Sequence, residues 1–519
     1  MPTGQRFFID ATRPDDSGAG TSEAAAWKTG DKATTLADAT PFHFGAGCEI
    51  LFKAGQTHTI KKLRLIKQGG SAAPVKIGRY GEGPDPILAT GGTNDEALFP
   101  GVIALDSCYR FEISHLVLDA NWQTAGPGTG VAGVIVRHIA DSSIVHAVVC
   151  RNVVARKAGQ DGFVFHAFAA AAAPTPSMLV NCEGDRCMDN GWGLYGPSVG
   201  FTVWNGWWHG NGNLGLSVPD YGPLGGDGGS SHDTAVGVLD AFNRYENNRD
   251  GSHHINTGVP SATLLGNYYR GNSQAALKLM DYGPAANSYP QLWTVLGCLF
   301  VIDAAATGNG GVIFGRDGED VPPATGVDAG TGGVFSGLFA HNTIVNASAI
   351  PSLFMSWKDH AANDTAAFQL ANNLFVRDGA GPHVEIKRRG RPINFTASRN
   401  GFSSDASGQF VLDGANKTLA EMKTAGIFAA TSAAAAPQMT GDPDDDPANA
   451  VLGAASPFRG VADNLDAVAA ALGVSVRELF RGLFPSGRAR NLGCFDFASS
   501  PSGLLLPRGP VPAFPAYAF

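Results

Sequence analysis

Short stretches of alternating apolar and polar residues recur through the middle of the chain, and several of them follow an Asp-Gly or Asn-Gly pair. Examples are residues 161–165, 190–194 and 250–254. Alternation with a period of two predicts strands rather than helices. The stretches return after roughly 24 to 45 residues, a spacing typical of stacked repeats. We therefore expect an all-β solenoid in which each coil buries its apolar residues against the neighbouring coils.

The pattern divides the chain into three predicted parts. Residues 1–100 form an N-terminal cap and the first coils, and the stretch from Ala24 to Thr29 is expected to open a short helix. Residues 101–400 form the solenoid body, whose long Gly-rich and Ala-rich loops are expected to wall a groove. Residues 401–519 supply the last coils and a tail, with helical spacing over 464–484 that predicts capping helices.

Composition supports this picture and removes some classes of function. The chain of 519 residues contains 68 glycines, only 16% charged residues and a net charge of −9. A negative chain without a long basic stretch is a poor partner for nucleic acid. No segment is long and apolar enough to span a membrane. The seven cysteines are odd in number, and Cys182 and Cys187 are expected to be buried thiols.

The first hundred residues resemble a known group of proteins. The matching segments are residues 8–10, 18–21, 26–29, 47–55 and 77–81. Their order resembles that of secreted right-handed parallel β-helix proteins of the polysaccharide lyase (pectate-lyase-like) type. One departure is visible, because Ala46-Gly47-Cys48 stands where these proteins usually have Pro-Gly-Asp. The resemblance implies a right-handed parallel β-helix, and it does not by itself imply one reaction.

Outward side chains of successive coils form rows, and polar rows are candidates for a glycan-binding face. The register of the strands is inferred here, and a slip of one residue would reverse every assignment. Aromatic groups can stack on sugar rings, and charged groups can bind hydroxyls and carboxylates. The substrate-binding candidates are Tyr195, Asp220, Tyr221, Tyr282, Lys358 and His360.

The first chemistry that fits is β-elimination on a polymer that contains uronic acids. It needs a base for the C5 proton and a cation that neutralises the sugar carboxylate. Lys278 is the candidate base, assisted by His253 and Arg316. Ca²⁺ is a possible cofactor, because it prefers oxygen ligands. Its candidate ligands are Asp250, Asp281 and Asp317.

The second chemistry is hydrolysis by two carboxylates, of which one donates a proton and the other activates water or attacks directly. Asp281 with Asp317 could supply this pair, and so could Asp220 with Asp250. Asp and Asn are also common in solenoid turns for structural reasons, because their side chains cap backbone groups.

The leading prediction is therefore an enzyme that cleaves a polysaccharide, with a lyase ahead of a glycoside hydrolase. The alternatives are a phage tailspike-type capsule depolymerase or adhesin, and a carbohydrate-binding protein without catalysis. Met1 to Phe8 lacks the apolar core of a signal peptide. We expect an extracellular protein whose signal was removed, or a virion protein. The predicted state is a monomer, or a trimer if the protein is a tailspike.

Overall fold

The chain forms two compact units that are each built from parallel strands. Unit 1 comprises residues 1–238, 246–250 and 516–519, and unit 2 comprises residues 239–245 and 251–515. Two strands contain residues of both units, β18 (Val236–Ala241) and β19 (Arg244–Glu246). The computed structural model describes the following residues: 4–39, 43–61, 63–70, 72–90, 101–121, 132–137, 147–166, 177–195, 200–212, 226–231, 236–255, 261–272, 274–279, 291–308, 310–315, 334–356, 365–388, 394–439, 452 and 455–458.

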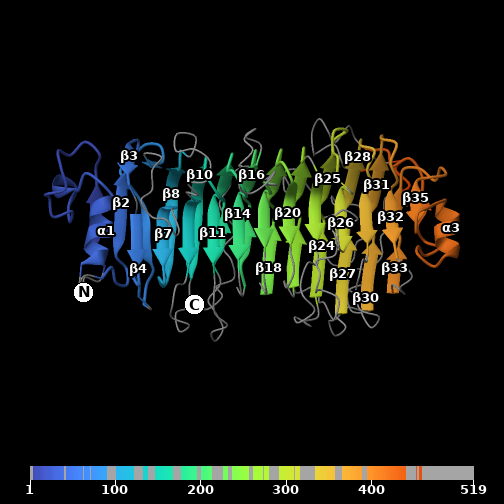
Figure 1. The fold of residues 1–519 in the computed structure, drawn as a ribbon, viewed down its shortest axis with the longest axis horizontal. Helices are drawn as coiled ribbons and strands as arrows, with labels where there is room; N and C mark the ends of the chain where they lie inside the picture. Colours follow the sequence, from blue (N-terminus) through green and yellow to red (C-terminus); the bar gives the residue numbers. More distant parts are fainter. Residues whose placement is uncertain are drawn as a thin grey trace, which may run out of the picture. The chain divides into compact units, whose positions relative to one another are not determined.

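Unit 1 is a parallel β-helix whose coils contribute to three rows of strands, here named face 1, face 2 and face 3 (Figure 1). Face 1 contains β1 (Arg6–Ile9), β2 (Glu49–Lys53), β5 (Val75–Tyr80), the first halves of β8 (Phe111–Asp119) and β10 (Val148–Arg156), β12 (Met178–Val180) and β15 (Thr202–Trp204). Face 2 contains β3 (Thr57–Ile60), β6 (Ile87–Thr90), the second halves of β8 and β10, β13 (Glu183–Asp185) and β16 (Trp207–His209). Face 3 contains β4 (Leu63–Ile66), β7 (Gly101–Asp106), β9 (Ala132–Arg137), β11 (Phe163–His166), β14 (Trp192–Tyr195) and β17 (Gly229–Ser231).

A single residue with positive φ makes each sharp turn from face 1 to face 2 in the later coils of unit 1. Asn152, Asn181 and Asn205 all have φ near +53°. Asparagine adopts this left-handed conformation more readily than other residues with a side chain. The amides also bond between coils, because Asn205 Nδ2 donates to Asn181 Oδ1 at 2.8 Å. The Asn residues that recur in the sequence are therefore turn residues that also join one coil to the next.

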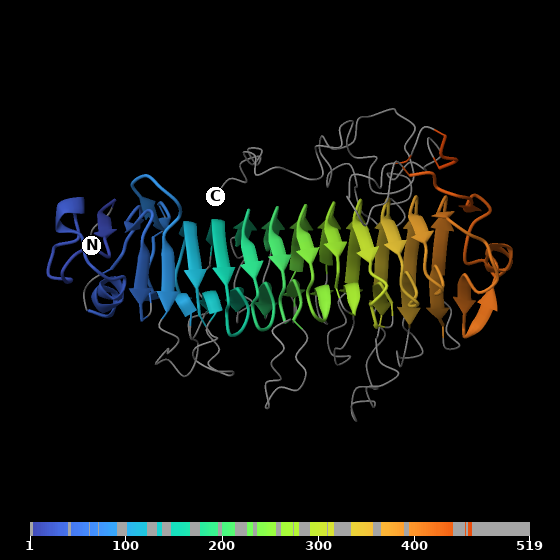
Figure 2. The ribbon, with the colours of Figure 1, turned by 90° about the horizontal axis from the view of Figure 1, so that it is seen from above.

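Unit 2 repeats the same three-row architecture (Figure 2). Face 1 contains β21 (Ser261–Leu265), β24 (Gln291–Leu296), β27 (Val334–Ala340), β30 (Thr365–Ala371) and β33 (Asn394–Ser398). Face 2 contains β22 (Tyr268–Arg270), β25 (Leu299–Ile302), β28 (Thr343–Asn346), β31 (Leu374–Arg377), β34 (Gly401–Phe402) and β37 (Ala433–Ala434). Face 3 contains β20 (Gly251–Ile255), β23 (Ala275–Leu279), β26 (Val312–Gly315), β29 (Leu353–Ser356), β32 (Val384–Lys387) and β35 (Phe410–Leu412).

The interior of the coils is filled with large side chains that stack in the direction of the repeat. In unit 2, Tyr245, Tyr269 and Phe300 form a continuous stack with ring centroids 5.1 and 4.7 Å apart. In unit 1, Phe163 meets Trp208 edge-on at 5.8 Å. Each of these rings is fully buried, so coil-to-coil burial supplies the hydrophobic stabilisation that a globular core would otherwise give. The predicted parallel β-helix is confirmed.

The N-terminal cap differs from the expected helix at Ala24 to Thr29. A single 3-10 turn, η1 (Glu23–Ala25), is followed by Trp27, which bridges to Ile9 of β1. The Asp16 carboxylate then accepts hydrogen bonds from the backbone N–H groups of Lys28 and Thr29. These contacts hold the backbone in an extended conformation, and the helix α1 (Asp31–Asp38) begins only after them.

Before β37, unit 2 contains a short antiparallel strand, β36 (Ala415–Lys417), and the helix α3 (Leu419–Thr424). A capping box between Thr418 and Glu421 fixes the start of α3. The capping helices predicted over 464–484 lie outside the described residues.

Two expectations from composition can be compared with the described part of the chain. Cys182 and Cys187 are free and buried, as predicted. No helix among the residues in the ranges above is long and apolar enough to cross a membrane.

Candidate active site

The turn that leads into face 3 of unit 1 repeats an acidic or amide residue followed by glycine. The pairs are Asp161-Gly162, Asn190-Gly191 and Asp227-Gly228. The N–H of Gly162 donates to the carbonyl of Asn190, and the N–H of Gly191 donates to that of Asp227. A Cβ at Gly162 would lie 2.6 Å from the carbonyl oxygen of Gly191. Glycine therefore permits the close stacking that brings the residues before it into one row.

Asp161 is the most closely held carboxylate of this row. Its Oδ2 accepts a hydrogen bond of 2.7 Å from the Tyr195 hydroxyl, and its Oδ1 accepts one of 2.9 Å from the backbone N–H of Asn190. Asn190 Nδ2 also donates to the Tyr195 hydroxyl at 3.4 Å. A Cβ at Gly193 would overlap both Asp161 Oδ2 and the Tyr195 ring. The absence of a side chain at Gly193 thus makes room for the pair.

Four carboxylates of unit 1, here named the carboxylate ladder, influence one another electrostatically: Asp161, Asp189, Asp227 and Asp250. Asp161 and Asp227 are buried, whereas Asp189 and Asp250 are partly exposed. Burial raises the pKa of Asp161 to about 6, although hydrogen bonds from Tyr195 and Asn190 oppose the increase. Burial, followed by repulsion from the other three carboxylates, raises the pKa of Asp189 well above its ordinary value. The ladder therefore contains carboxyl groups that resist ionisation.

Tyr195, a predicted substrate-binding residue, ends strand β14 beside this ladder. Its ring stacks on His166, with the centroids 4.8 Å apart and the planes 18° from parallel. Burial and the nearby carboxylates of Asp161 and Asp189 raise the pKa of the Tyr195 hydroxyl well above its usual value. The hydroxyl therefore stays protonated and serves as the donor to Asp161.

Lys278 lies in unit 2, on strand β23, and its side chain is 5% exposed. Its Nζ donates to Gln274 Oε1 at 3.4 Å. The strand register pairs His254 with Lys278 and pairs His253 with the buried Leu277. In the backbone register, Lys278 is therefore aligned with His254, whereas the prediction grouped it with His253, whose role as a site residue stays a prediction. The alternation of apolar and polar residues alone could not determine which of the two adjacent histidines aligns with Lys278.

The predicted calcium ligands are only partly described. Asp250 lies in unit 1 at the start of the turn into β20, and its backbone N–H donates to the carbonyl of Gly226. No three His, Cys, Asp or Glu side chains in the described ranges converge closely enough to hold a metal ion. The other two proposed ligands, Asp281 and Asp317, lie outside those ranges.

Several other predicted site residues also lie outside the described residues, and the side chain of His253 is not described. The remaining ones are Arg316, Asp220, Tyr221, Tyr282, Lys358 and His360. The predicted pairs Asp281 with Asp317 and Asp220 with Asp250 are therefore still predictions.

Sequence reasoning treated Asp161 and Asn190 as turn residues and did not single out Asp189. A signal was nevertheless present. Asp161 and Asp227 lie in turns that stack on the turn of Asn190, which carries a neutral amide. Like charges in aligned turns repel one another, so the two Asp residues are a sequence signal that a structural role alone does not require.

The chain is similar to a few known proteins. No protein-family model matches the chain. A segment of 93 residues, 17% of this chain, is 30% identical to a lacto-N-biosidase of Bifidobacterium longum subsp. longum and spans 6% of that protein. The chain is also similar to the structure of pectate lyase Pel9A, with 14% identity, a TM-score of 0.47, and coverage of 95% of this chain and 97% of the other.

A GH136 lacto-N-biosidase from Eubacterium ramulus is a further similar structure. The identity is 12% and the TM-score is 0.40, over 74% of this chain and 68% of the other. A pectate lyase is thus among the similar structures, as the resemblance of the first hundred residues implies. The assignment of the fold rests on the strand pairing described above.

Proposed function

We propose that this chain is a carbohydrate-active enzyme that cleaves a polysaccharide at the carboxylate ladder of unit 1. The observation that carries the proposal is the state of Asp189. Asp189 is a partly exposed residue whose carboxyl group is largely desolvated, and burial, followed by repulsion from three other carboxylates, raises its pKa. Strongly perturbed carboxyl groups cluster at catalytic sites. The similar segment of a lacto-N-biosidase supports a carbohydrate substrate.

Hydrolysis by a protonated and an ionised carboxyl group is the reaction that this arrangement supports best. Asp189 donates its proton to the glycosidic oxygen while the bond from that oxygen to the anomeric carbon breaks. Asp250, the other partly exposed carboxylate, takes a proton from water as the water oxygen bonds to the anomeric carbon. Asp189 is then ionised and Asp250 protonated, and exchange of protons with solvent restores both groups.

Asp161 acts as a positioning residue in this scheme, because it is only 2% exposed and is more deeply buried than Asp189 and Asp250. Its charge is the largest electrostatic influence on Asp189 after burial itself. Tyr195 and Asn190 each donate one hydrogen bond to the Asp161 carboxyl group, and Asn190 Nδ2 also donates to the Tyr195 hydroxyl, which keeps the group in place. The buried part of the ladder thus maintains the proton on the exposed part.

β-Elimination on a uronic-acid polymer is the second candidate, and Lys278 is the observation that favours it. A lysine with 5% exposure in the middle of a strand is unusual, since lysine is rarely buried. As the base, Lys278 would take the C5 proton while the bond from C4 to the leaving oxygen breaks. Ca²⁺ bound by Asp250, Asp281 and Asp317 remains a proposal, because the described residues do not form that site.

The setting of the reaction follows from the substrate. A polysaccharide-cleaving β-helix enzyme would act outside the cell, or on a virion if the protein is a tailspike-type depolymerase. We propose a monomer in the first case and a trimer in the second. A polysaccharide is the proposed partner in both.

A screen of neutral and acidic polysaccharides tests the reaction. Release of reducing ends and ultraviolet absorbance of an unsaturated product would be measured together, with EDTA and with added Ca²⁺. We expect reducing ends without absorbance, insensitivity to EDTA, and a decline as pH rises and Asp189 ionises. The matched variants are Asp189→Asn and Lys278→Ala.

The same screen separates the alternatives. Absorbance that appears with the reducing ends, survives Asp189→Asn and disappears in Lys278→Ala would replace hydrolysis by elimination. Loss of that signal with EDTA would support the calcium proposal. No cleavage of any polymer would contradict an enzyme and would favour an adhesin or another binding protein.

A further inference from the structure

Face 2 of unit 1 presents a polar and aromatic patch that the proposed reaction does not use. Strands β13 and β16 pair so that Glu183 aligns with Trp207, and Asp185 aligns with His209. Trp208 lies between Trp207 and His209 in β16 and is completely buried. Since side chains alternate along a strand, Trp207 and His209 lie on the outer side of the same strand.

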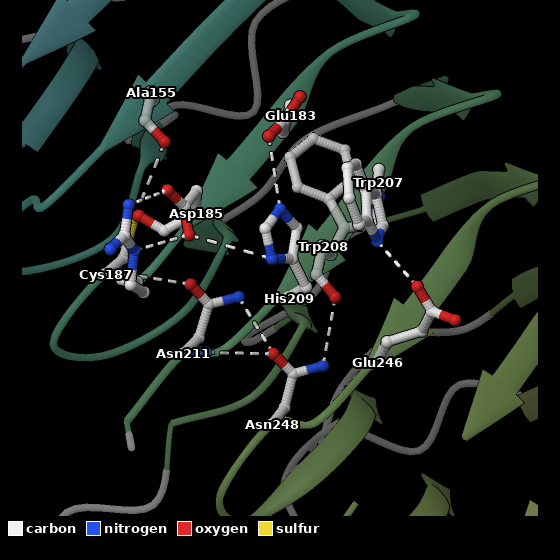
Figure 3. Close-up of polar contacts among 11 residues, drawn as sticks. Ala155, Glu183, Asp185, Cys187, Trp207, Trp208, His209, Asn211, Glu246 and Asn248 are labelled. Atoms are coloured by element: carbon white, nitrogen blue, oxygen red, sulfur yellow. Dashed lines mark hydrogen bonds and ion pairs between the residues drawn. The ribbon is translucent and has the colours of Figure 1, made fainter. Parts of the chain in front are cut away.

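Trp207 is held in one orientation by two contacts. Its ring stacks on that of His209, with the centroids 4.0 Å apart and the planes 23° from parallel. Its indole Nε1–H donates to Glu246 Oε2 at 2.7 Å. Figure 3 shows the indole beside the imidazole, with Glu246 at its edge. The indole is thus ordered before any ligand arrives, which reduces the entropy lost on binding.

His209 is fixed in turn by two carboxylates. Its Nε2 lies 3.2 Å from Glu183 Oε1, and its Nδ1 lies 3.7 Å from Asp185 Oδ1 (Figure 3). Asp185 also forms an ion pair of 2.7 Å with Arg186. The imidazole therefore has acidic partners on both sides and provides a rigid support for the indole.

The exposure of Trp207 is the second observation that points to a ligand. Trp207 is 37% exposed, and among the described residues it is the exposed large apolar side chain. A flat aromatic ring with polar groups at its edge is the combination that binds a sugar ring, because the apolar face of the sugar covers the indole while its hydroxyls bond to the rim. Side chains in the rim that can accept such bonds are Glu183 and Glu246.

We propose that Trp207, supported by His209, is a binding platform for a neutral sugar unit of a glycan. The charge of the rim selects the class of sugar. Glu183, Asp185 and Glu246 are acidic, and Arg186 is already paired with Asp185. A uronate carboxylate would be repelled by this rim, whereas neutral hydroxyls would find acceptors. The platform goes beyond the proposed reaction and does not depend on it.

Affinity electrophoresis in native gels tests the platform. The gels contain galactomannan, xyloglucan, mixed-linkage β-glucan or starch as neutral polymers, and polygalacturonate or alginate as acidic ones. All variants are made in the Asp189→Asn background, so that cleavage does not remove the polymer. We expect retardation by at least one neutral polymer and none by the acidic ones.

Variants at the platform provide the decisive comparison. Trp207→Ala should weaken binding about tenfold or more, the loss expected of a central aromatic contact. Trp207→Tyr should retain part of the binding, because it keeps an aromatic ring. Trp204→Ala is the matched control, since Trp204 is a partly exposed tryptophan of the same coil on face 1, and it should bind like its parent. Thermal melts followed by circular dichroism check that every variant is folded.

Three outcomes would overturn the platform: no retardation by any neutral polymer, retardation by acidic polymers alone, or equal retardation of the parent and Trp207→Ala. The cleavage assay is scored separately on the wild-type chain. Cleavage without retardation would reject only the platform, and retardation without cleavage would reject only the proposed reaction.

Discussion

The two units stack similar residues in their turns, with opposite electrostatic results. In unit 2 an amide ladder consists of Asn342, Asn373 and Asn400, all fully buried. Asn373 Nδ2 donates to the carbonyl of Phe339 at 2.8 Å and to Asn400 Oδ1 at 2.9 Å. Each amide both donates and accepts, so the ladder is neutral and satisfies the buried backbone groups around it.

The carboxylate ladder of unit 1 has no such balance. Ionised carboxylates only accept hydrogen bonds, and Asp161 receives its bonds from Tyr195 and Asn190 rather than from the next carboxylate. Burial, followed by the like charges, raises the pKa of Asp189, and the carboxylates do not join the coils. The comparison indicates that the amide ladder of unit 2 serves stability, whereas the carboxylate ladder of unit 1 is an electrostatically strained cluster that a purely structural turn does not need.

Replacing Asp189 by Asn should have the largest effect and should separate activity from stability. Loss of the proton donor is expected to lower kcat by about a hundredfold or more. A raised pKa means that ionisation of Asp189 is unfavourable in the folded chain, so stability is lost as pH rises above the ordinary value of 3.8. The variant should therefore unfold at a higher temperature than the wild type at neutral pH, with no such gain below that value.

Kinetics on the polymer identified in the screen and thermal melts across pH measure both effects. An inactive variant that is also less stable at neutral pH would show that Asp189 is a structural residue. A variant with unchanged kcat would remove Asp189 from the reaction.

Introducing a charge into the amide ladder tests the other half of the comparison. In Asn373→Asp a carboxylate oxygen would face the carbonyl of Phe339, where the amide now donates. The buried, unsatisfied charge should lower the free energy of unfolding by about 3 kcal/mol or more at neutral pH. Urea unfolding measures the change.

Asn205→Asp serves as the matched control for this substitution. Asn205 belongs to a turn of unit 1 in which the side chain is partly exposed, and Asp tolerates its positive φ. Its loss should be about 1 kcal/mol or less. Equal losses at both positions would mean that burial of the amide ladder does not determine its importance.

The sequence was sufficient to predict the architecture, because every coil must bury its apolar side chains against the neighbouring coils and therefore repeats the same pattern. Phe163 and Phe165 flank Val164 after an Asp-Gly turn, and that alternation places both rings in the interior, where they are buried. The same reasoning failed near Ala24, where the contacts of Asp16 and Ile9 override a helical stretch. Local pattern predicts strands well when neighbouring coils reinforce it, and poorly where a distant side chain competes.

The candidate site was harder to predict, because it depends on the register between coils. Burial raises the pKa of Asp189 first, and repulsion from carboxylates 28 or more positions away in the chain, such as Asp161 and Asp227, raises it further. No local sequence motif shows which distant carboxylates will lie close to Asp189. The position of His253 depends on the same information, since pairing between β20 and β23 aligns His254, and not His253, with Lys278. Sequence spacing indicates which residues can align, and only the pairing shows which of them do.

Removing the charge of Asp161 should have the smallest effect and should show how the ladder acts. In Asp161→Asn the repulsion on Asp189 decreases, so the pKa of Asp189 falls and the alkaline limb of the pH profile moves to lower pH. Each unit of displacement lowers the rate on that limb about tenfold, while the rate on the acidic side changes little. Tyr195→Phe should move the limb in the same direction by less, because Asp161 without its donor remains protonated to higher pH. The dependence of kcat/KM on pH measures both shifts, and a limb that stays in place in Asp161→Asn would show that the carboxylates do not act as one system.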